Sequence, residues 1–259
     1  MSPAAVTLTL IGGPTVMIEL GGLRLLTDPT FDPPGLYRTA PVRFEKTSGP
    51  ALSLAHIGAL DAVLLSHDQH LDNLDQAGRA MLPSVTTTYT TLAGAARLGG
   101  NAQGLAPFET RALQTDAGRV LVTAAPARHG PVGIEPISGD VVGFLLGTDQ
   151  PGDAIYVTGD TVWFAGIAEI AGRFAPRVVV LFTGAAEPRG RFHMTMGCND
   201  ALEAAHAFPD AAIVAIHNEG WGHFTESQDE LAAAFATLGV ASRLTRLERG
   251  KAVTFQPSG

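Results

Sequence analysis

The segment Leu64-Leu65-Ser66-His67-Asp68-Gln69-His70-Leu71-Asp72-Asn73-Leu74-Asp75 places two histidines and three carboxylates directly after a short apolar run. Imidazole nitrogen and carboxylate oxygen are donors that zinc and similar ions accept in proteins. The rigid end of a strand allows the side chains that follow it to converge on one ion. A polar helix start, with Asp or Asn as the cap and the histidines in solvent, is the alternative for this segment alone.

Further ligand-type residues occur later in the chain, each directly after a β-like run: His129 after residues 120–124, Asp160 after 154–158 and His217 after 212–216. Taken singly, each is typical of a hydrogen-bonded residue without a catalytic role. Four strand ends that all deliver ligand-type side chains are hard to obtain by accident. The pattern therefore predicts a metal site where these ends meet.

The rest of the chain predicts a mixed α/β fold. Apolar and alternating runs separated by Gly and Pro predict strands at 6–11, 15–20, 23–27, 62–65, 85–91, 120–124, 141–146, 154–158, 178–182, 212–216, 243–247 and 252–255. Helices are predicted at 74–80, 92–98, 162–174, 196–207 and 228–238. Ser227 and Glu230 have capping-box spacing at the last helix, and Gly239 is its stop.

The chain is expected to form one domain over residues 1–259, because it has no repeat and no Ser- or charge-rich linker. The Pro- and Gly-rich stretch from Asp28 to about Ser53 shows little periodicity. It predicts a long surface loop beside a site.

Composition limits the class of protein. The formal net charge is −8 and the chain has only two lysines, so a nucleic-acid substrate is not favoured, since such binding relies on many contacts from Lys and Arg to phosphates. Cys198 is the single cysteine, which excludes an intramolecular disulfide and fits a reducing cytosol. The apolar runs are too short to span a bilayer, and the N-terminus lacks the pattern of a secretory signal. A cytoplasmic protein with a small-molecule substrate is expected.

The chain resembles the metallo-β-lactamase-fold hydrolases over nearly its whole length, in the branch similar to ascorbate-phosphate lactonases and N-acyl-phosphatidylethanolamine phospholipases. Residues 10–15 and 25–29 match the opening strands and the Asp-Pro turn of that family, and residues 66–75 resemble its His-x-His-x-Asp-His loop. The resemblance implies a four-layer αββα sandwich with one or two Zn²⁺ ions at one end, with Mn²⁺, Fe or Ni as alternatives. It also implies that the further ligands are His129, a bridging Asp160 and His217.

The loop departs from the family pattern by one residue. Counted forward from the strand, His67 takes the first His position of the loop. Counted backward from the end of the segment, Asp68 takes that position, and the next ones fall to His70, Asp72 and Asn73. An insertion between His67 and His70 reconciles the two counts and favours His67 as the ligand, with Asp68 as the alternative.

Asn73 stands where the family has a histidine, and an amide is a poorer ligand than imidazole for a borderline metal. The second metal site, expected from Asp72, Asp160 and His217, is therefore predicted to be weak. One tightly held ion and an optional second one are expected. The resemblance also implies that the metal activates a water, and that Asp72 orients or deprotonates it and passes the proton to the leaving group.

Several other residues are candidates for the pocket. Asp28 resembles a residue that fixes a ligand imidazole, although a turn aspartate without that role would look the same. His193 is a candidate to bind substrate, donate a proton or replace the missing loop histidine, and an exposed neighbour of a helix cap is the alternative. The remaining candidates for substrate contact, with packing as the alternative, are Glu219, Trp221 and His223.

The leading hypothesis is a hydrolase that uses a metal-activated water to cleave a small ester, lactone or phosphodiester. A degenerate member of the fold that binds a ligand or partner without turnover is a second hypothesis, which Asn73 favours and the many retained ligands oppose. A metal-dependent nuclease is a third, against which the acidic balance argues. The evident partners for a substrate phosphate are Arg128, Arg189 and Arg191.

Overall fold

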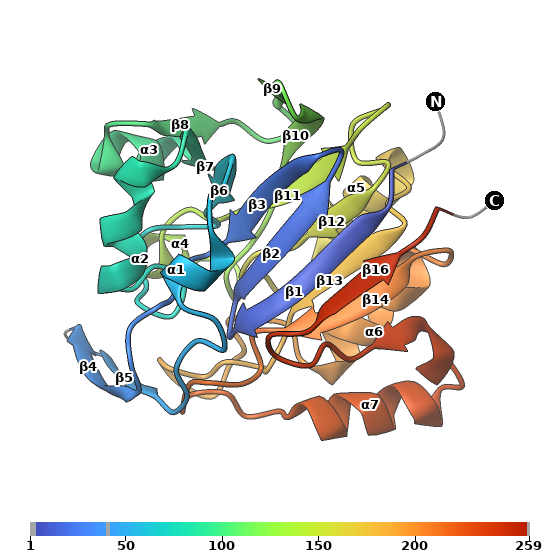
Figure 1. Ribbon diagram of the computed structural model, residues 1–259. Helices are drawn as coiled ribbons and strands as arrows, with labels where there is room; N and C mark the ends of the chain where they lie inside the picture. Colours follow the sequence, from blue (N-terminus) through green and yellow to red (C-terminus); the bar gives the residue numbers. More distant parts are fainter. Residues whose placement is uncertain (1–3, 40–41, 258–259) are drawn as a thin grey trace.

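Two large β-sheets form the centre of the molecule in the computed structural model, which describes residues 4–39 and 42–257 (Figure 1). Within these residues, one seven-stranded sheet has the order β16-β1-β2-β3-β6-β7-β8 and the other has the order β15-β14-β13-β12-β11-β10-β9. The first sheet consists of β16 (Ala252–Phe255), β1 (Val6–Gly12), β2 (Thr15–Leu20), β3 (Leu23–Thr27), β6 (Ala62–Leu64), β7 (Thr87–Thr91) and β8 (Ala102–Leu105). The second consists of β15 (Leu244–Thr245), β14 (Ala212–Ile216), β13 (Val178–Phe182), β12 (Ile155–Val157), β11 (Val142–Gly147), β10 (Gly118–Pro126) and β9 (Thr110–Thr115).

The helices lie outside the pair of sheets (Figure 1). They are α1 (Leu54–Ile57), α2 (Gln76–Met81), α3 (Leu92–Leu98), α4 (Glu135–Ser138), α5 (Ala165–Arg173), α6 (Cys198–Ala207) and α7 (Gln228–Thr237), with short 3₁₀ turns at Leu82–Ser84 and Ala241–Arg243. None of the helices in the described part of the chain is long and apolar enough to cross a membrane.

Three apolar clusters show how the layers stack. The central cluster joins the facing sides of the two sheets, with Leu8 and Leu25 from one and Phe144 and Phe182 from the other. A second cluster packs the outer face of the second sheet against α5, α6 and α7. A third packs the outer face of the first sheet against α1 and α2. This is the predicted four-layer αββα sandwich, and the prediction of the fold class is confirmed.

The direction of the strands brings several chain segments to one end of the sandwich. Strands β3, β6 and β7 run parallel to one another, and so do β12, β13 and β14. The carboxyl ends of parallel strands share one edge of a sheet, and in open α/β sheets ligands bind outside these ends. The loops after β6, β12 and β14 therefore start at the same end of the molecule.

The predicted stretches agree with the structure in most of the core and fail at the periphery. The helix at 92–98, the strands at 178–182 and 212–216, and the capping box of Ser227 and Glu230 are confirmed. The prediction of a long loop from Asp28 to Ser53 is wrong, because β4 (Gly35–Thr39) and β5 (Val42–Lys46) pair as antiparallel strands within it. Elements β8, β9, α1 and α4 are also unpredicted, since each is short and has few buried positions to give a period.

Candidate metal centre

Side chains from four separate loops meet at one end of the sandwich. The ligand-type atoms of His67, His70, His129 and Asp160 all lie within 4.8 Å of one another. A second group with the same spacing consists of Asp72, Asp160 and His217. Asp160 belongs to both groups, so its carboxylate lies between them. The structure thus brings together six of the residues that the sequence singles out.

The first group has the spacing of a metal site. His67 Nε2 lies 2.9 Å from His70 Nδ1, which lies 3.1 Å from His129 Nε2. Asp160 Oδ2 lies 3.6 Å from His129 Nε2. Ligands at about 2.0–2.1 Å from a tetrahedral zinc ion lie about 3.3 Å from one another. These side chains therefore stand at the separations that a shared ion would impose.

Hydrogen bonds behind two of the rings fix which nitrogens face the centre as acceptors. His129 Nδ1 lies 2.7 Å from the carbonyl oxygen of Met194, so that nitrogen carries the proton and Nε2 has the lone pair. Ser66 Oγ donates to Asp28 at 2.8 Å and lies 2.9 Å from His67 Nδ1, so it accepts the proton of that ring. Two lone pairs thus face His70 Nδ1, which has at most one proton to share. A cation satisfies this arrangement.

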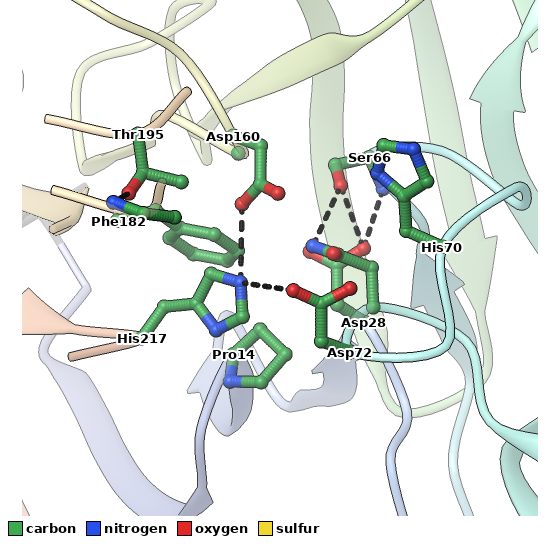
Figure 2. A network of polar contacts seen from close by, with 12 residues as sticks. Pro14, Asp28, Ser66, His70, Asp72, Asp160, Phe182, Thr195 and His217 are labelled. Atoms are coloured by element: carbon green, nitrogen blue, oxygen red, sulfur yellow. Dashed lines mark hydrogen bonds and ion pairs between the residues drawn. The ribbon is translucent and has the colours of Figure 1, made fainter. Parts of the chain in front are cut away.

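The second group places the buried His217 imidazole against two carboxylates (Figure 2). His217 Nε2 lies 3.3 Å from Asp160 Oδ1 and 3.8 Å from Asp72 Oδ2, and its ring faces both carboxylates. Among the described residues, neither ring nitrogen of His217 has a hydrogen-bond partner, and the same holds for Asp160 Oδ1 and Asp72 Oδ1. Buried polar atoms are rarely left unpaired without a reason. Here the donor set fits a divalent ion.

Two residues of the centre have backbone conformations that side-chain-bearing residues seldom adopt. Asp28 has a φ of 27° and His217 a φ of 56°. Such conformations cost of the order of 1–3 kcal/mol and cluster at functional sites, where the surrounding structure enforces them. Each lies directly after a strand, β3 and β14, where the chain turns so that its side chain enters the centre.

Burial keeps two imidazoles of the first group, those of His67 and His70, neutral. It lowers the pKa of His70 to about 4, with a further contribution from the neighbouring His129. Burial, together with the charge of His70, also holds the pKa of His67 well below its usual value. Neutral imidazoles are the form that binds metal. His217 differs, because the attraction of Asp160 and Asp72 outweighs its burial and raises its pKa.

The carboxylates of Asp160 and Asp72 stay ionised although they are buried. Burial alone would raise the pKa of Asp160, but His217 and His129 outweigh it and the pKa falls below its usual range. The same balance, with His223 and His217 as the partners, lowers the pKa of Asp72. Asp28 behaves in the opposite way, because burial and the charge of Asp160 raise its pKa well above its usual value.

Aromatic residues border the centre on one side. His223 Nε2 lies 2.9 Å from Asp72 Oδ2, and its ring meets that of Phe44 edge-on at 5.3 Å between centroids. Phe44 also faces His70 at 6.5 Å and Trp221 at 6.2 Å. Trp221 is buried behind them, with the Lys46 ammonium 5.3 Å from its ring. The hairpin β4–β5 thus contributes Phe44 to the edge of the metal centre.

Two further loop residues, Asp68 and Asn73, make contacts of their own. The buried carboxylate of Asp68 is bound by Arg97 of α3, through Nε at 3.0 Å and Nη2 at 2.5 Å, so the structure gives the first loop position to His67. Asn73 Nδ2 lies 3.5 Å from Ser66 Oγ. Its Oδ1 has no hydrogen-bond partner within the residues described. The extra loop residue therefore directs Asp68 outward while His67 and His70 still face one another.

The pocket candidates outside this loop also differ in whether their side chains reach the metal centre. His193 does not join the centre: its Nε2 lies 3.6 Å from Glu187 Oε1 and its side chain is 40% exposed. The carboxylate of Glu219 pairs with Arg249 at 3.3 Å, on the outer side. Asp28 reaches the ligand His67 only through Ser66. Sequence reasoning correctly groups these residues by strand end, but their side-chain directions separate them.

Sequence reasoning assigns no role at the centre to several residues that border or support it, namely Phe44, Ser66, Arg97 and Lys46. The alternation of residues 42–46 gives a signal for a strand that would carry Phe44. Arg189 is noted in the sequence only as a partner for phosphate, and it lines the small cavity next to His70, Asp72 and His129. Arg97 gives no signal, because its partner Asp68 lies far away in the sequence.

The fold and the site together define a class of protein. A four-layer sandwich of two sheets with His and Asp side chains gathered at the strand ends is the metallo-β-lactamase fold. A sequence profile described as Beta-lactamase superfamily domain matches residues 23–218. The chain belongs to this family.

Related proteins match this chain over two thirds or more of its length. The UPF0173 protein YddR of Bacillus subtilis (strain 168) is 27% identical over 257 residues, which covers 96% of this chain and 99% of that protein. A UPF0173 metal-dependent hydrolase of Pelotomaculum thermopropionicum is 31% identical over 182 residues, which covers 67% of this chain and 74% of that protein. The crystal structure of isothiocyanate hydrolase from Delia radicum gut bacteria has a TM-score of 0.81 at 25% identity, covering 97% of this chain and 100% of that one.

Proposed function

We propose that this metal-dependent hydrolase of the metallo-β-lactamase superfamily cleaves a small ester, lactone or phosphodiester as a single domain of residues 1–259. The observation that carries the proposal is the pair of imidazole lone pairs, on His67 and His129, that face His70 Nδ1 beside the Asp160 carboxylate. Three neutral imidazoles and one carboxylate form a donor set that suits zinc, and iron, manganese and nickel accept it too. A cytoplasmic location accords with the single cysteine, Cys198.

The residues of the two groups have distinct roles in this proposal. His67, His70, His129 and Asp160 would hold a first ion, and Asp72, Asp160 and His217 would hold a second one more weakly. A bound divalent ion lowers the pKa of a coordinated water and polarises the carbonyl or phosphoryl oxygen under attack. Asp72, ionised and with Oδ1 unpaired, orients the attacking water, accepts its proton and returns it to the leaving group.

The metal part of the proposal is tested by elemental analysis. Protein purified without added metal should contain close to one equivalent of zinc, manganese, iron or nickel, and the variants Asp160→Ala and His129→Ala should lose it while their unfolding remains cooperative. A metal content below about a tenth of an equivalent in the wild type would favour the non-catalytic binding protein. Retained metal and activity in both variants would refute the assignment of the ligands.

The substrate is tested with a panel of small electrophiles. A 4-nitrophenyl ester, a six-membered lactone and bis(4-nitrophenyl) phosphate represent the three bond types. Benzyl isothiocyanate is a second candidate class, because the solved isothiocyanate hydrolase shares the fold over nearly the full length. RNA serves as the comparison for a nuclease, which the charge of −8 disfavours. Metal-dependent turnover of one class, lost in Asp160→Ala, identifies the chemistry.

A further inference from the structure

Arg189 brings a positive charge to the cavity beside the metal centre. It lies on the loop between β13 and α6 and is half-buried. The cavity is small, and its lining also includes Phe44, His70, Asp72, His129, Asp160 and His223. Its charge reaches the centre, since it contributes to the lowered pKa of His70. A substrate placed against the metal ligands would therefore lie next to this guanidinium.

The guanidinium of Arg189 has no acidic partner or hydrogen bond within residues 4–39 and 42–257. The nearest carboxylate along the chain, Glu187, lies 3.6 Å from His193. Arg128, near the same centre, is engaged differently, because its Nε donates to Gly130 and its side chain lies over the ring of Phe164. Arg97 is bound to Asp68. Arg189 thus differs from Arg97 and Arg128 in that none of its guanidinium donors is engaged by the residues that the structure describes.

The carboxylates of the cavity do not serve as its partner. Asp72 lies against His223, and Asp160 lies between His217 and His129. Once these carboxylates hold metal, their negative charge is offset by the ion. A guanidinium keeps its charge at any physiological pH and offers paired N–H donors that match the two oxygens of a carboxylate or phosphate. An anionic group of a bound molecule is the partner that this position fits.

We propose that Arg189 binds an oxyanion group of the substrate, a carboxylate or a phosphate, next to the scissile bond. This inference rests on the proposed function and narrows it to anionic esters, lactones or phosphodiesters. Phe44, on the hairpin across the cavity, offers an apolar wall for the uncharged part of the same molecule. Arg189 then determines specificity, while the hydrolytic chemistry stays with the metal ligands.

Equilibrium binding tests the proposal without turnover. Benzoate and phenylphosphonate, which represent the two oxyanion sources, are titrated by calorimetry into zinc-loaded wild type, Arg189→Met and Arg191→Met. Arg191 is an exposed arginine of the same loop and is the matched control. Arg189→Met should weaken one or both ligands by about ten- to a hundredfold, the usual loss for a charge-assisted hydrogen bond pair, and Arg191→Met by less than about twofold. The ligand that is weakened more identifies the source.

The variants are compared at equal metal content and with the same unfolding midpoint. If Arg189→Met does not fold, Arg189→Gln, which is polar and closer in shape, decides the result. Equal affinities of the Arg189 variant and the wild type for both anions would overturn the proposal. So would an equal loss in Arg191→Met, since that result would reflect the general charge of the loop.

A pair of esters separates this inference from the proposed function. 4-Nitrophenyl hydrogen succinate carries a free carboxylate, and its methyl ester lacks that charge. Arg189→Met should lower kcat/KM for the charged ester by about tenfold or more and change the neutral one by less than about twofold. An equal loss on both esters would overturn the specificity role. Absence of metal-dependent turnover in the wild type would count against the proposed function, while anion binding would still decide the role of Arg189.

Discussion

Nε2 of His223 lies 2.9 Å from Oδ2 of Asp72, and this contact joins the loop after β14 to the loop after β6. Both side chains are almost completely buried. The other carboxylate oxygen, Asp72 Oδ1, has no hydrogen-bond partner among the residues described. His223 thus holds the same carboxylate oxygen of Asp72 that lies 3.8 Å from His217 Nε2 in the second group. Its position makes it a support for a ligand rather than a ligand itself.

Replacing His223 by Phe should therefore weaken the second metal site. Loss of a hydrogen bond behind a ligand typically lowers metal affinity by about ten- to a hundredfold. We expect that loss for the second equivalent of zinc and no change for the first, measured by competition with a chromophoric chelator. His206→Asn, on the exposed side of α6, is the control. Equal losses at both sites would mean that His223 supports the whole centre.

The contact between Asp68 and Arg97 leads to a second prediction. Arg97→Met leaves the buried Asp68 carboxylate without its partner, in the loop that carries His67 and His70. Because the Arg97 side chain is 42% exposed, water reaches the pair, and we expect a loss of about 1–2 kcal/mol rather than the larger cost of a fully buried pair. Metal affinity should fall as well, since the loop is less firmly held.

Urea denaturation of the metal-free protein and zinc competition measure the two effects of Arg97→Met. Arg246→Met removes an exposed ion pair with Asp229 and should cost about 0–1 kcal/mol without a change in zinc affinity. The double variant Asp68→Asn and Arg97→Met should recover part of the stability, because the uncompensated charge is gone. Wild-type zinc affinity in Arg97→Met would show that the loop keeps its shape unaided.

Sequence reasoning finds the ligands because the end of a strand is visible in the sequence. Apolar runs predict β6, β12 and β14, and the topology sends their carboxyl ends to one edge. His67, Asp160 and His217 follow those runs directly, so their approximate convergence is a consequence of the fold. The order of the four layers, by contrast, is implied by the resemblance to the metallo-β-lactamase-fold hydrolases, and the structure confirms it.

Sequence reasoning does not find what depends on side-chain direction and on distant partners. The one-residue insertion in the loop leaves His67 and Asp68 as alternatives, and the choice is made by Arg97, which belongs to a helix far along the chain. His193 lies on the long loop between β13 and α6, and its ring turns to Glu187. The alternation of residues 42–46 signals the strand that carries Phe44, but not that this strand lies beside the metal centre.

The lowered pKa of His70 predicts how the stability of the metal-free protein changes with pH. Between pH 6.5 and about 4 an unfolded chain binds a proton at this residue, whereas the folded protein does not. The free energy of unfolding should therefore fall as the pH falls through this window, by about 3 kcal/mol from His70 alone. His67, with its pKa also lowered, acts in the same direction. The lowered pKa values of Asp72 and Asp160 act mainly below about pH 4, where their stabilising contribution is lost.

The variant His70→Gln should reduce the slope of the unfolding free energy against pH. Unfolding by urea in the presence of EDTA, at intervals from pH 7 to 4.5, gives the slopes for the wild type and the variant. His56→Gln, which changes an exposed histidine of α1, should leave the slope as it is. His217 contributes the opposite sign, because its raised pKa gives stability that is present below pH 6.5 and lost at higher pH. Identical slopes in the wild type and His70→Gln would contradict the prediction.

The hairpin that carries Phe44 is attached to the metal loop by a buried ion pair. Lys46 Nζ lies 2.9 Å from Asp75 Oδ2, and the two side chains are 3% and 1% exposed. Asp75 also accepts hydrogen bonds from the backbone nitrogens of Asp32 and Gly78, so it joins the hairpin, the residues before it and the start of α2. Removal of one partner of a buried pair leaves the other charge unpaired, at a cost of about 3–5 kcal/mol.

Lys46→Met should accordingly destabilise the protein by about 3 kcal/mol, at the lower end of that range because the two backbone donors still stabilise Asp75. Lys251→Met is the matched control, since it removes an exposed pair with Glu248 and should cost about 0–1 kcal/mol. Urea denaturation at low and at high salt separates them further, because a buried pair is screened much less than an exposed one. Phe44 should lose its fixed place against His70 and His223 in Lys46→Met, so KM should rise more than kcat falls. A KM equal to that of the wild type in a destabilised variant would show that the hairpin stiffens the fold without shaping the cavity.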